Sequence, residues 1–158
     1  MKLYANPYDI SRAGFYFESL AEYEAGVKAF GAEEYMIDFI DADFDERIFA
    51  KMKVSQGNIG ESFERAEQIE ALDVEEMTAL AFLLDCGYSL DVAFDKLNEV
   101  CITKESLDNY AHGLMTECYD VPDNLLSYMD YRKFGRDLLC GGSVVELNGY
   151  LITNANDF

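Results

Sequence analysis

The sequence predicts a mixed α+β protein, built as an elongated chain of small lobes. The chain has 158 residues, of which half are apolar and 14% aromatic, so it can bury a core and is not a disordered acidic tail. Short strand-like runs lie near both ends of the chain, and helical periodicity fills the middle. Since proline occurs only twice, no proline-rich linker divides the chain. We expect an N-terminal α+β lobe at residues 1–56, an acidic helical lobe at 57–102, and a C-terminal helical lobe with a β-hairpin at 103–158.

Local signals place the elements of the first lobe. Ser19 followed by Glu22 forms a capping box, which begins a helix. Gly31 suits the exit of that helix. Apolar runs on either side of the helix indicate short strands. The expected strands are residues 3–8, 15–17 and 35–40.

The central lobe is predicted to be helical throughout. Asn58 can cap a first helix. Asp73 with Glu76 begins a second helix, which Gly87 ends. Ser89 then caps a third helix.

The C-terminal lobe combines helices with a hairpin. Helical spacing covers residues 104–118 and 131–138, and Pro122 fits the first turn of a short helix between them. Asn148-Gly149 is a strong signal for a type I′ turn between two strands.

The charge is strongly negative and unevenly distributed. The chain has 31 acidic and 12 basic residues, a formal net charge of −19. Residues 61–130 hold 17 acids and 3 bases, residues 1–60 hold 11 and 6, and residues 131–158 hold 3 of each. Such a surface repels phosphates, which argues against direct binding to nucleic acid or to an anionic membrane. We therefore expect a positively charged partner.

A cytoplasmic location is expected. No apolar run reaches the roughly 18 residues of a membrane span, and the N-terminus has no apolar signal core. The four cysteines form no C-x-x-C pair, so reduced thiols are the simplest interpretation. They are Cys86, Cys101, Cys118 and Cys140.

Motifs for catalysis or metal binding are absent from the sequence. There is no glycine-rich phosphate loop and no nucleophile elbow. The single histidine, His112, lies within a predicted helix, where a surface or packing role is favoured. Asp41 to Asp45 begins like a calcium loop, but Glu46 and Met52 stand where that loop needs glycine and glutamate. We expect no enzymatic activity, no cofactor and no metal.

The acids themselves are the candidate site. Helical surfaces usually interleave Lys or Arg with Glu, yet residues 61–130 contain only Arg65, Lys96 and Lys104. Because like-charge crowding costs stability, we infer that the charge has a use. After Asn58 the carboxylates recur every third residue as a slanted stripe. The predicted target-binding surface consists of Glu61, Glu64, Glu67, Glu70, Asp73, Glu75, Glu76, Asp85, Asp91, Asp95, Glu99, Asp41, Asp43 and Asp45.

One use of such a surface is to imitate DNA. Duplex DNA carries about one charge per 1.7 Å of axis, so a charge of −19 corresponds to roughly 32 Å of duplex. Carboxylates held on helices can occupy the phosphate sites of a DNA-binding protein. Two alternatives stay open. One is a DNA mimic that inhibits another defence system, such as a CRISPR effector or other nuclease; the second is an acidic interaction module without mimicry.

A C-terminal motif resembles a known family. Residues 128–138, Tyr-Met-Asp-Tyr-Arg-Lys-Phe-Gly-Arg-Asp-Leu, resemble the Y-I-D-Y-x-x-[YF]-[GA]-R-D-L signature of the ArdA antirestriction family. Residues 142–152 resemble its closing hairpin. Residues 33–39 are similar to its E-E-[YW]-x-I-x-D-Y segment, and residues 20–30 to the helix before that segment. Residues 6–15 depart from the family's Y-N-x-G turn, and the chain lacks the tryptophan of the following strand.

This resemblance implies an antirestriction protein. Members of the family are elongated, curved homodimers of three lobes per chain that imitate bent B-DNA. They occupy the DNA-binding groove of type I restriction–modification enzymes, and so help mobile genetic elements to evade host defence. Within the signature, Tyr128, Tyr131, Phe134 and Leu138 have helical spacing. We interpret the signature as a mark of the fold, with these four residues in the core, and assign inhibition to the acids above.

Overall fold

Helices and short antiparallel sheets make up the computed structural model, which describes all residues from 1 to 158. Eight α-helices, two short 3₁₀-helices and two three-stranded antiparallel sheets give about 51% helix and 15% strand. The expected α+β class is therefore confirmed. The chain divides into two units, Met1–Asp73 and Val74–Phe158. The finer division into three lobes stays a prediction.

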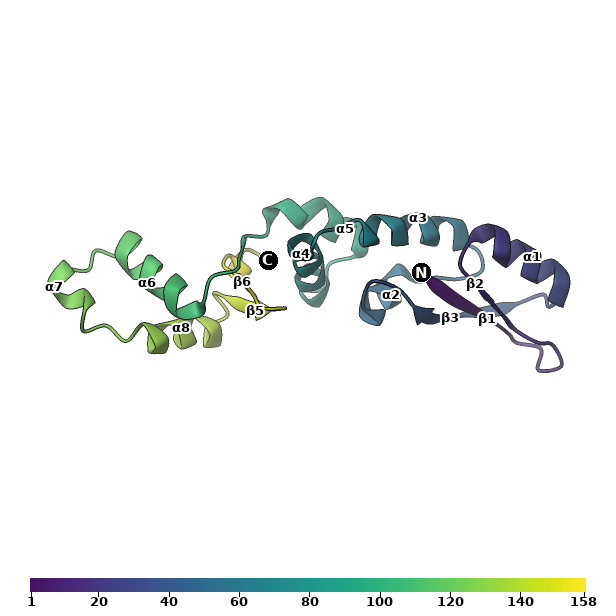
Figure 1. The fold of residues 1–158 in the computed structure, drawn as a ribbon, viewed down its shortest axis with the longest axis horizontal. Helices are drawn as coiled ribbons and strands as arrows, with labels where there is room; N and C mark the ends of the chain where they lie inside the picture. The colour runs from purple at the N-terminus through teal and green to yellow at the C-terminus, as the bar shows by residue number, and fades with distance from the viewer. The chain divides into compact units, whose positions relative to one another are not determined.

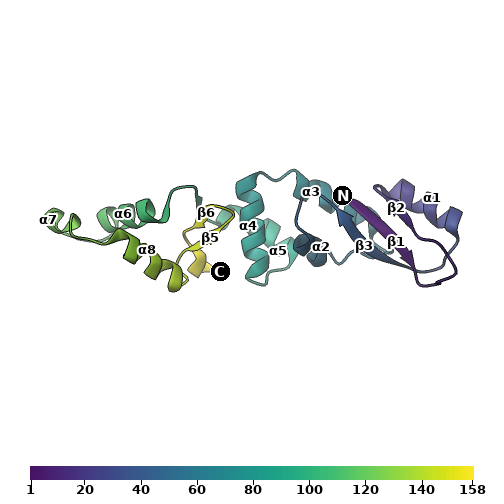
Figure 2. The same cartoon turned by 60° about the horizontal axis from the view of Figure 1, so that its bottom comes forward.

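The first unit contains one sheet and three helices. Its elements are β1 (Lys2–Pro7), β2 (Phe15–Phe17), α1 (Leu20–Phe30), β3 (Tyr35–Asp41), α2 (Glu46–Met52) and α3 (Ile59–Glu70). β1 lies between β2 and β3 and pairs antiparallel with both (Figure 2). α1 and α3 lie on the same side of this sheet (Figure 1).

Alternation along the strands decides which face of the sheet is buried. Leu3 of β1, Phe17 of β2 and Ile37 of β3 are buried, because successive side chains of a strand point to opposite faces. Tyr23 of α1 and Ile59 of α3 belong to the same core. The core of the first unit therefore lies between one face of the sheet and these helices.

Both ends of α1 follow the sequence signals. The hydroxyl of Ser19 accepts a hydrogen bond from the backbone N–H of Glu22 at 3.2 Å, and the carboxylate of Glu22 accepts one from the N–H of Glu18 at 2.7 Å. Gly31 has φ of 66°, and its N–H donates to the carbonyl of Val27 at 3.0 Å. The predicted Ser19 cap and left-handed exit are both confirmed, whereas the returning bond of Glu22 reaches the N–H of Glu18 instead of that of Ser19.

A short helix, α2, follows the acidic turn and was not predicted. Asp45 begins it: the carboxylate accepts a hydrogen bond from the backbone N–H of Arg47 at 2.8 Å. Ile48 is buried and holds the helix to the unit. Seven residues make only two turns, too few for a clear periodicity.

Asn58 precedes α3 as expected, but its side chain does not cap that helix. Instead, its side-chain oxygen accepts a hydrogen bond from the backbone N–H of Ser55 at 2.7 Å. The amide therefore stabilises the loop before α3, since Asn readily closes turns through local backbone contacts.

The second unit is mainly helical. Its elements are α4 (Val74–Asp85), α5 (Leu90–Lys96), the 3₁₀-helix η1 (Leu97–Glu99), β4 (Ile102–Thr103), α6 (Leu107–Glu117), α7 (Asp123–Leu126), α8 (Tyr131–Cys140), β5 (Val145–Leu147), β6 (Tyr150–Ile152) and the 3₁₀-helix η2 (Ala155–Asp157). α4 ends as predicted at Gly87, which has φ of 96°, and the N–H of Tyr88 donates to the carbonyl of Leu83 at 3.2 Å.

The C-terminal hairpin forms at the expected turn. Asn148 and Gly149 have φ of 54° and 79°, as a type I′ turn requires. β6 also pairs with β4, so the hairpin becomes a three-stranded sheet of order β4-β6-β5. Two residues, Ile102 and Thr103, carry no sequence pattern that reveals a strand.

One residue of the signature motif departs from its expected place. Tyr131 and Phe134 are half-buried in α8, whereas Tyr128 is 84% exposed. The core assignment of Tyr128 was wrong, because α8 begins only at residue 131 and the helical spacing does not continue through residue 128. None of the helices combines the length and apolarity needed to cross a membrane.

Candidate functional site

All fourteen acids of the predicted target-binding surface belong to exposed residues. In the first unit they stand in the turn around the end of β3, on α3, and directly after α3. In the second unit they stand on α4, α5 and η1. The first unit carries Asp41, Asp43, Asp45, Glu61, Glu64, Glu67, Glu70 and Asp73, and the second carries Glu75, Glu76, Asp85, Asp91, Asp95 and Glu99.

α3 separates an apolar face from an acidic one. Ala66 and Ile69 are buried in the first unit. Each residue turns the helix by about 100°, so Glu64 lies about 180° from the centre of the buried face. Glu61 and Glu67 lie about 60° to either side of Glu64. The outer face of α3 thus presents three carboxylates to solvent, which we call the α3 stripe.

The slant of the predicted row brings Glu70 back toward the buried face. Its carboxylate accepts a hydrogen bond from the amino group of Met1 at 3.1 Å, and its side chain is only 27% exposed. Glu70 therefore ties the start of β1 to the end of α3, which is a structural contact as well as a negative charge.

Helix stability does not account for the acids at the C-terminal ends of α3 and α4. Neither α3 nor α4 has a basic residue in its last turn. A helix C-terminus favours cations by about 0.3–1 kcal/mol, yet Glu67, Glu70 and Asp85 occupy these ends. The acids at these positions oppose the helix dipole.

In the turn before α2, Asp45 has a structural role of its own. Its hydrogen bonds with the side chain and backbone of Arg47 hold the pKa of Asp45 below its ordinary value. Asp41 and Asp43 are exposed beside it. No group of three His, Cys, Asp or Glu side chains is placed to hold a metal ion.

In the second unit the acids are partly offset by local contacts. Glu75 and Glu76 lie in the first turn of α4, where the helix dipole favours negative charge. Glu99 accepts a hydrogen bond from Lys96 at 2.6 Å, and this bond raises the pKa of Lys96. Asp91 lies in the first turn of α5, where the helix dipole likewise favours negative charge.

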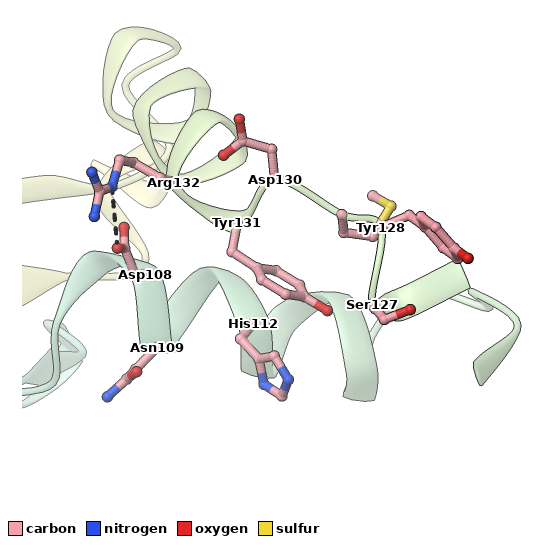
Figure 3. A pocket seen from close by; sticks show the side chains of 9 residues that line it. Asp108, Asn109, His112, Ser127, Tyr128, Asp130, Tyr131 and Arg132 are labelled. Atoms are coloured by element: carbon pink, nitrogen blue, oxygen red, sulfur yellow. Dashed lines mark ion pairs between the residues drawn. The ribbon is translucent and has the colours of Figure 1, made fainter. Parts of the chain in front are cut away.

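A shallow pocket of about 530 Å³ surrounds His112 of α6 (Figure 3). The imidazole packs edge-on against the ring of Tyr131, with 4.8 Å between ring centroids. Arg132 pairs with Asp108 at 3.5 Å, and both residues line the pocket (Figure 3). Ser127 lines the pocket but has no hydrogen bond to His112. These contacts are those of a packed α6–α8 pair.

The cysteines are free and exposed. Partial burial, with Asp85 nearby, raises the pKa of the Cys86 thiol. A raised pKa disfavours the thiolate, the form that acts as a nucleophile or metal ligand.

Fold and charge together define the class of protein as a strongly acidic α+β protein. A family model described as Antirestriction protein (ArdA) matches residues 8–152. The chain therefore belongs to the ArdA antirestriction protein family, as the C-terminal motif predicted. Members of this family are inhibitors rather than enzymes and interact with restriction–modification enzymes. No match is found among curated proteins.

The signature motif of the family packs α8 against α6. Gly135 of α8 is buried, and a side-chain carbon added there would lie 2.8 Å from Leu107 at the start of α6. Glycine allows the two helices to approach closely. This contact agrees with our interpretation of the motif as a mark of the fold.

One exposed surface was missed by sequence reasoning. The strands of the first unit were predicted, but not which residues on them stay outside. The signal was present in Phe15-Tyr16-Phe17, where Tyr16 points away from two buried neighbours and is 62% exposed.

Proposed function

We propose that this protein is a DNA mimic that occupies the DNA-binding groove of type I restriction–modification enzymes and so protects incoming mobile DNA. The observation that carries the proposal is that each unit carries exposed carboxylates on folded helices, with few cations among them. The partner is a basic groove that otherwise binds DNA phosphates. The fourteen acids of the predicted surface would fill the phosphate sites of that groove.

The spacing of charges on α3 supports this proposal. Successive carboxylates from Glu61 to Glu70 rise by about 4.5 Å along the helix axis. One strand of duplex DNA carries one phosphate per about 3.4 Å of helix axis, so the axial rises are of similar size. Because the helix backbone is already ordered, it presents these charges without paying for ordering a flexible chain on binding.

The charge balance of each unit supports it as well. The first unit holds 16 acids and 7 bases, a net charge of −9, and the second holds 15 and 5, a net charge of −10. Charge of this density attracts a basic groove over long range, and salt screens the attraction. Binding should therefore be fast and salt-sensitive.

Membership of the ArdA family supports the rest of the proposal. We include in it a homodimer of chains with three lobes each, at residues 1–56, 57–102 and 103–158, acting in the cytoplasm. His112, the cysteines and the pocket around α6 have no part in inhibition on this proposal.

Displacement of DNA is the test. A type I enzyme bound to a labelled duplex is titrated with the protein and followed by gel shift. Near-stoichiometric release of the DNA, which weakens between about 0.05 M and 0.2 M salt, is the expected result. Release only from a different DNA-binding nuclease would support the alternative target. An enzyme that keeps its DNA at all doses would contradict mimicry and favour an acidic interaction module.

A further inference from the structure

The outer face of the first sheet carries large side chains that no helix covers. Side chains at alternate positions of β1, β2 and β3 face away from the core. An antiparallel sheet with one solvated face is usually polar on that face. Here Tyr16 is 62% exposed, Met36 is 46% exposed, and Ile40 is 44% exposed. These three residues leave apolar side-chain surface on this face open to a partner.

Two tyrosines form the centre of this face. Tyr4 and Tyr16 are opposite each other in the register of β1 and β2. Their ring centroids are 4.8 Å apart, with an interplanar angle of 52°. The cross-strand pair fixes both rings, so their faces are ordered before any partner arrives.

Carboxylates flank the tyrosine pair on both neighbouring strands. Asp38 of β3 lies opposite Tyr4 in the register and is half-buried. Glu18 follows β2 and reaches the ammonium group of Lys2 at 3.1 Å. That same ammonium group lies 5.8 Å from the centroid of the Tyr16 ring. The ammonium group of Lys2 thus already contacts an aromatic ring and a carboxylate of this face at the same time.

We propose that this face is a docking surface for an arginine side chain of a basic partner protein, which stacks on the Tyr4–Tyr16 pair while its guanidinium pairs with Asp38 or Glu18. The inference rests on the proposed function only in taking the partner to be a basic DNA-binding enzyme. It adds a contact that is not an imitation of phosphate.

The chemistry of the surface selects this occupant. A nucleic acid or an anionic membrane is repelled by a unit with a net charge of −9. A purely apolar partner would take Asp38 and Glu18 out of water with only a 3.4 Å hydrogen bond from Asn6 and the Lys2 ammonium group to offset the cost. Arginine suits both features, because its planar guanidinium stacks on aromatic rings and pairs with carboxylates. Lysine has the charge but no planar face to stack.

Peptide titration of the full chain tests the inference without a restriction enzyme. Hexa-arginine and hexa-lysine are added at about 0.15 M salt, where long-range attraction is screened, and the tyrosine ring resonances are followed by NMR. Hexa-arginine should shift the rings of Tyr4 and Tyr16 more than those of Tyr8 and Tyr128, which are 67% and 84% exposed. Hexa-lysine should shift the rings of Tyr4 and Tyr16 less, because its ammonium groups cannot stack on them. Equal shifts at all four rings, or equal effects of the two peptides, would overturn the proposal.

Two variants give opposite predictions for the affinity of hexa-arginine. Tyr16→Leu should lower it by about two- to fivefold, and Tyr16→Phe, which keeps the ring, should restore it. Lys2→Ala should raise the affinity, because it frees both the Tyr16 ring and Glu18. Tyr128→Leu serves as the matched control and should change nothing. Unchanged affinity in both Tyr16→Leu and Lys2→Ala would refute the site.

The outcome is independent of the proposed function. Failure of the peptide titration removes the arginine site and leaves the displacement of DNA untouched. Failure to displace DNA, with a positive titration, removes DNA mimicry and leaves the arginine site in place.

Discussion

Neutralising the α3 stripe should weaken inhibition more than the same change of charge elsewhere in the first unit. The variant Glu61→Gln/Glu64→Gln/Glu67→Gln removes three exposed carboxylates and keeps the size of each side chain. It changes the formal net charge from −19 to −16. Glu70 is left intact because it holds the amino group of Met1.

The magnitude follows from the exposure of these side chains. An ion pair between exposed groups contributes about 0.2–1 kcal/mol, so three lost pairs cost about 0.6–3 kcal/mol in all. That corresponds to a rise of roughly 3- to 140-fold in the concentration needed to displace half of the bound DNA. The difference should shrink as salt is added, because exposed charges are screened.

The matched control makes the same change of charge outside the predicted surface. Glu24→Gln/Glu33→Gln/Glu34→Gln also brings the net charge to −16, at three exposed residues of the same unit. It should cost clearly less than the variant of the α3 stripe. Circular dichroism and thermal unfolding should show that both variants keep the fold, since exposed substitutions usually change stability by no more than about 0.5 kcal/mol.

The comparison between the two variants separates an effect of total charge from an effect of where the carboxylates lie. Equal losses of inhibition would show that total charge acts without any particular placement of carboxylates. No loss in the variant of the α3 stripe, with its fold intact, would refute the assignment of that stripe to target binding.

Four further predictions concern the fold, the pH response and the assembly. Gly26→Ala should lower stability by about 1–3 kcal/mol, measured by thermal unfolding, because the added methyl group meets the ring of Phe15. Since hydrogen bonds to Arg47 lower the pKa of Asp45, its contribution to stability is present above its ordinary pKa and is lost as the pH falls through the lower folded value. Asp45→Asn should therefore reduce the loss of melting temperature below about pH 4. His112→Ala should leave DNA displacement unchanged. A large loss of displacement would show that the pocket around His112 takes part in inhibition. Light scattering should give the mass of a dimer; a monomer at working concentration would contradict the proposed assembly.

Elements with strong local signals were predictable from the sequence. The helix cap at Ser19, the left-handed exits at Gly31 and Gly87, and the turn at Asn148-Gly149 all lie where expected. Each of these depends on hydrogen bonds or backbone angles within a few neighbouring residues. Such contacts form in the same way whatever surrounds them.

Elements that depend on distant partners were not predictable. β4 exists only because Ile102 pairs with Ile152, fifty residues later. Asn58 precedes α3 as the sequence predicts, yet its side chain closes the loop through Ser55. Tyr128 has the right spacing for a buried position but lies outside α8. Spacing alone does not show where a helix begins.

The candidate site divides in the same way. The sequence determines how many acids there are and how few cations lie among them, because charge is additive. It also predicts that the acids are exposed on helices, opposite the apolar residues, because helical periodicity is local. Only the tertiary structure showed that the carboxylate of Glu70 pairs with the amino group of Met1. It also showed that the rings of Tyr4 and Tyr16 pack together beside Asp38 on the outer face of the first sheet. These contacts join segments far apart in the chain, and strand register and packing, rather than any local pattern, bring them together.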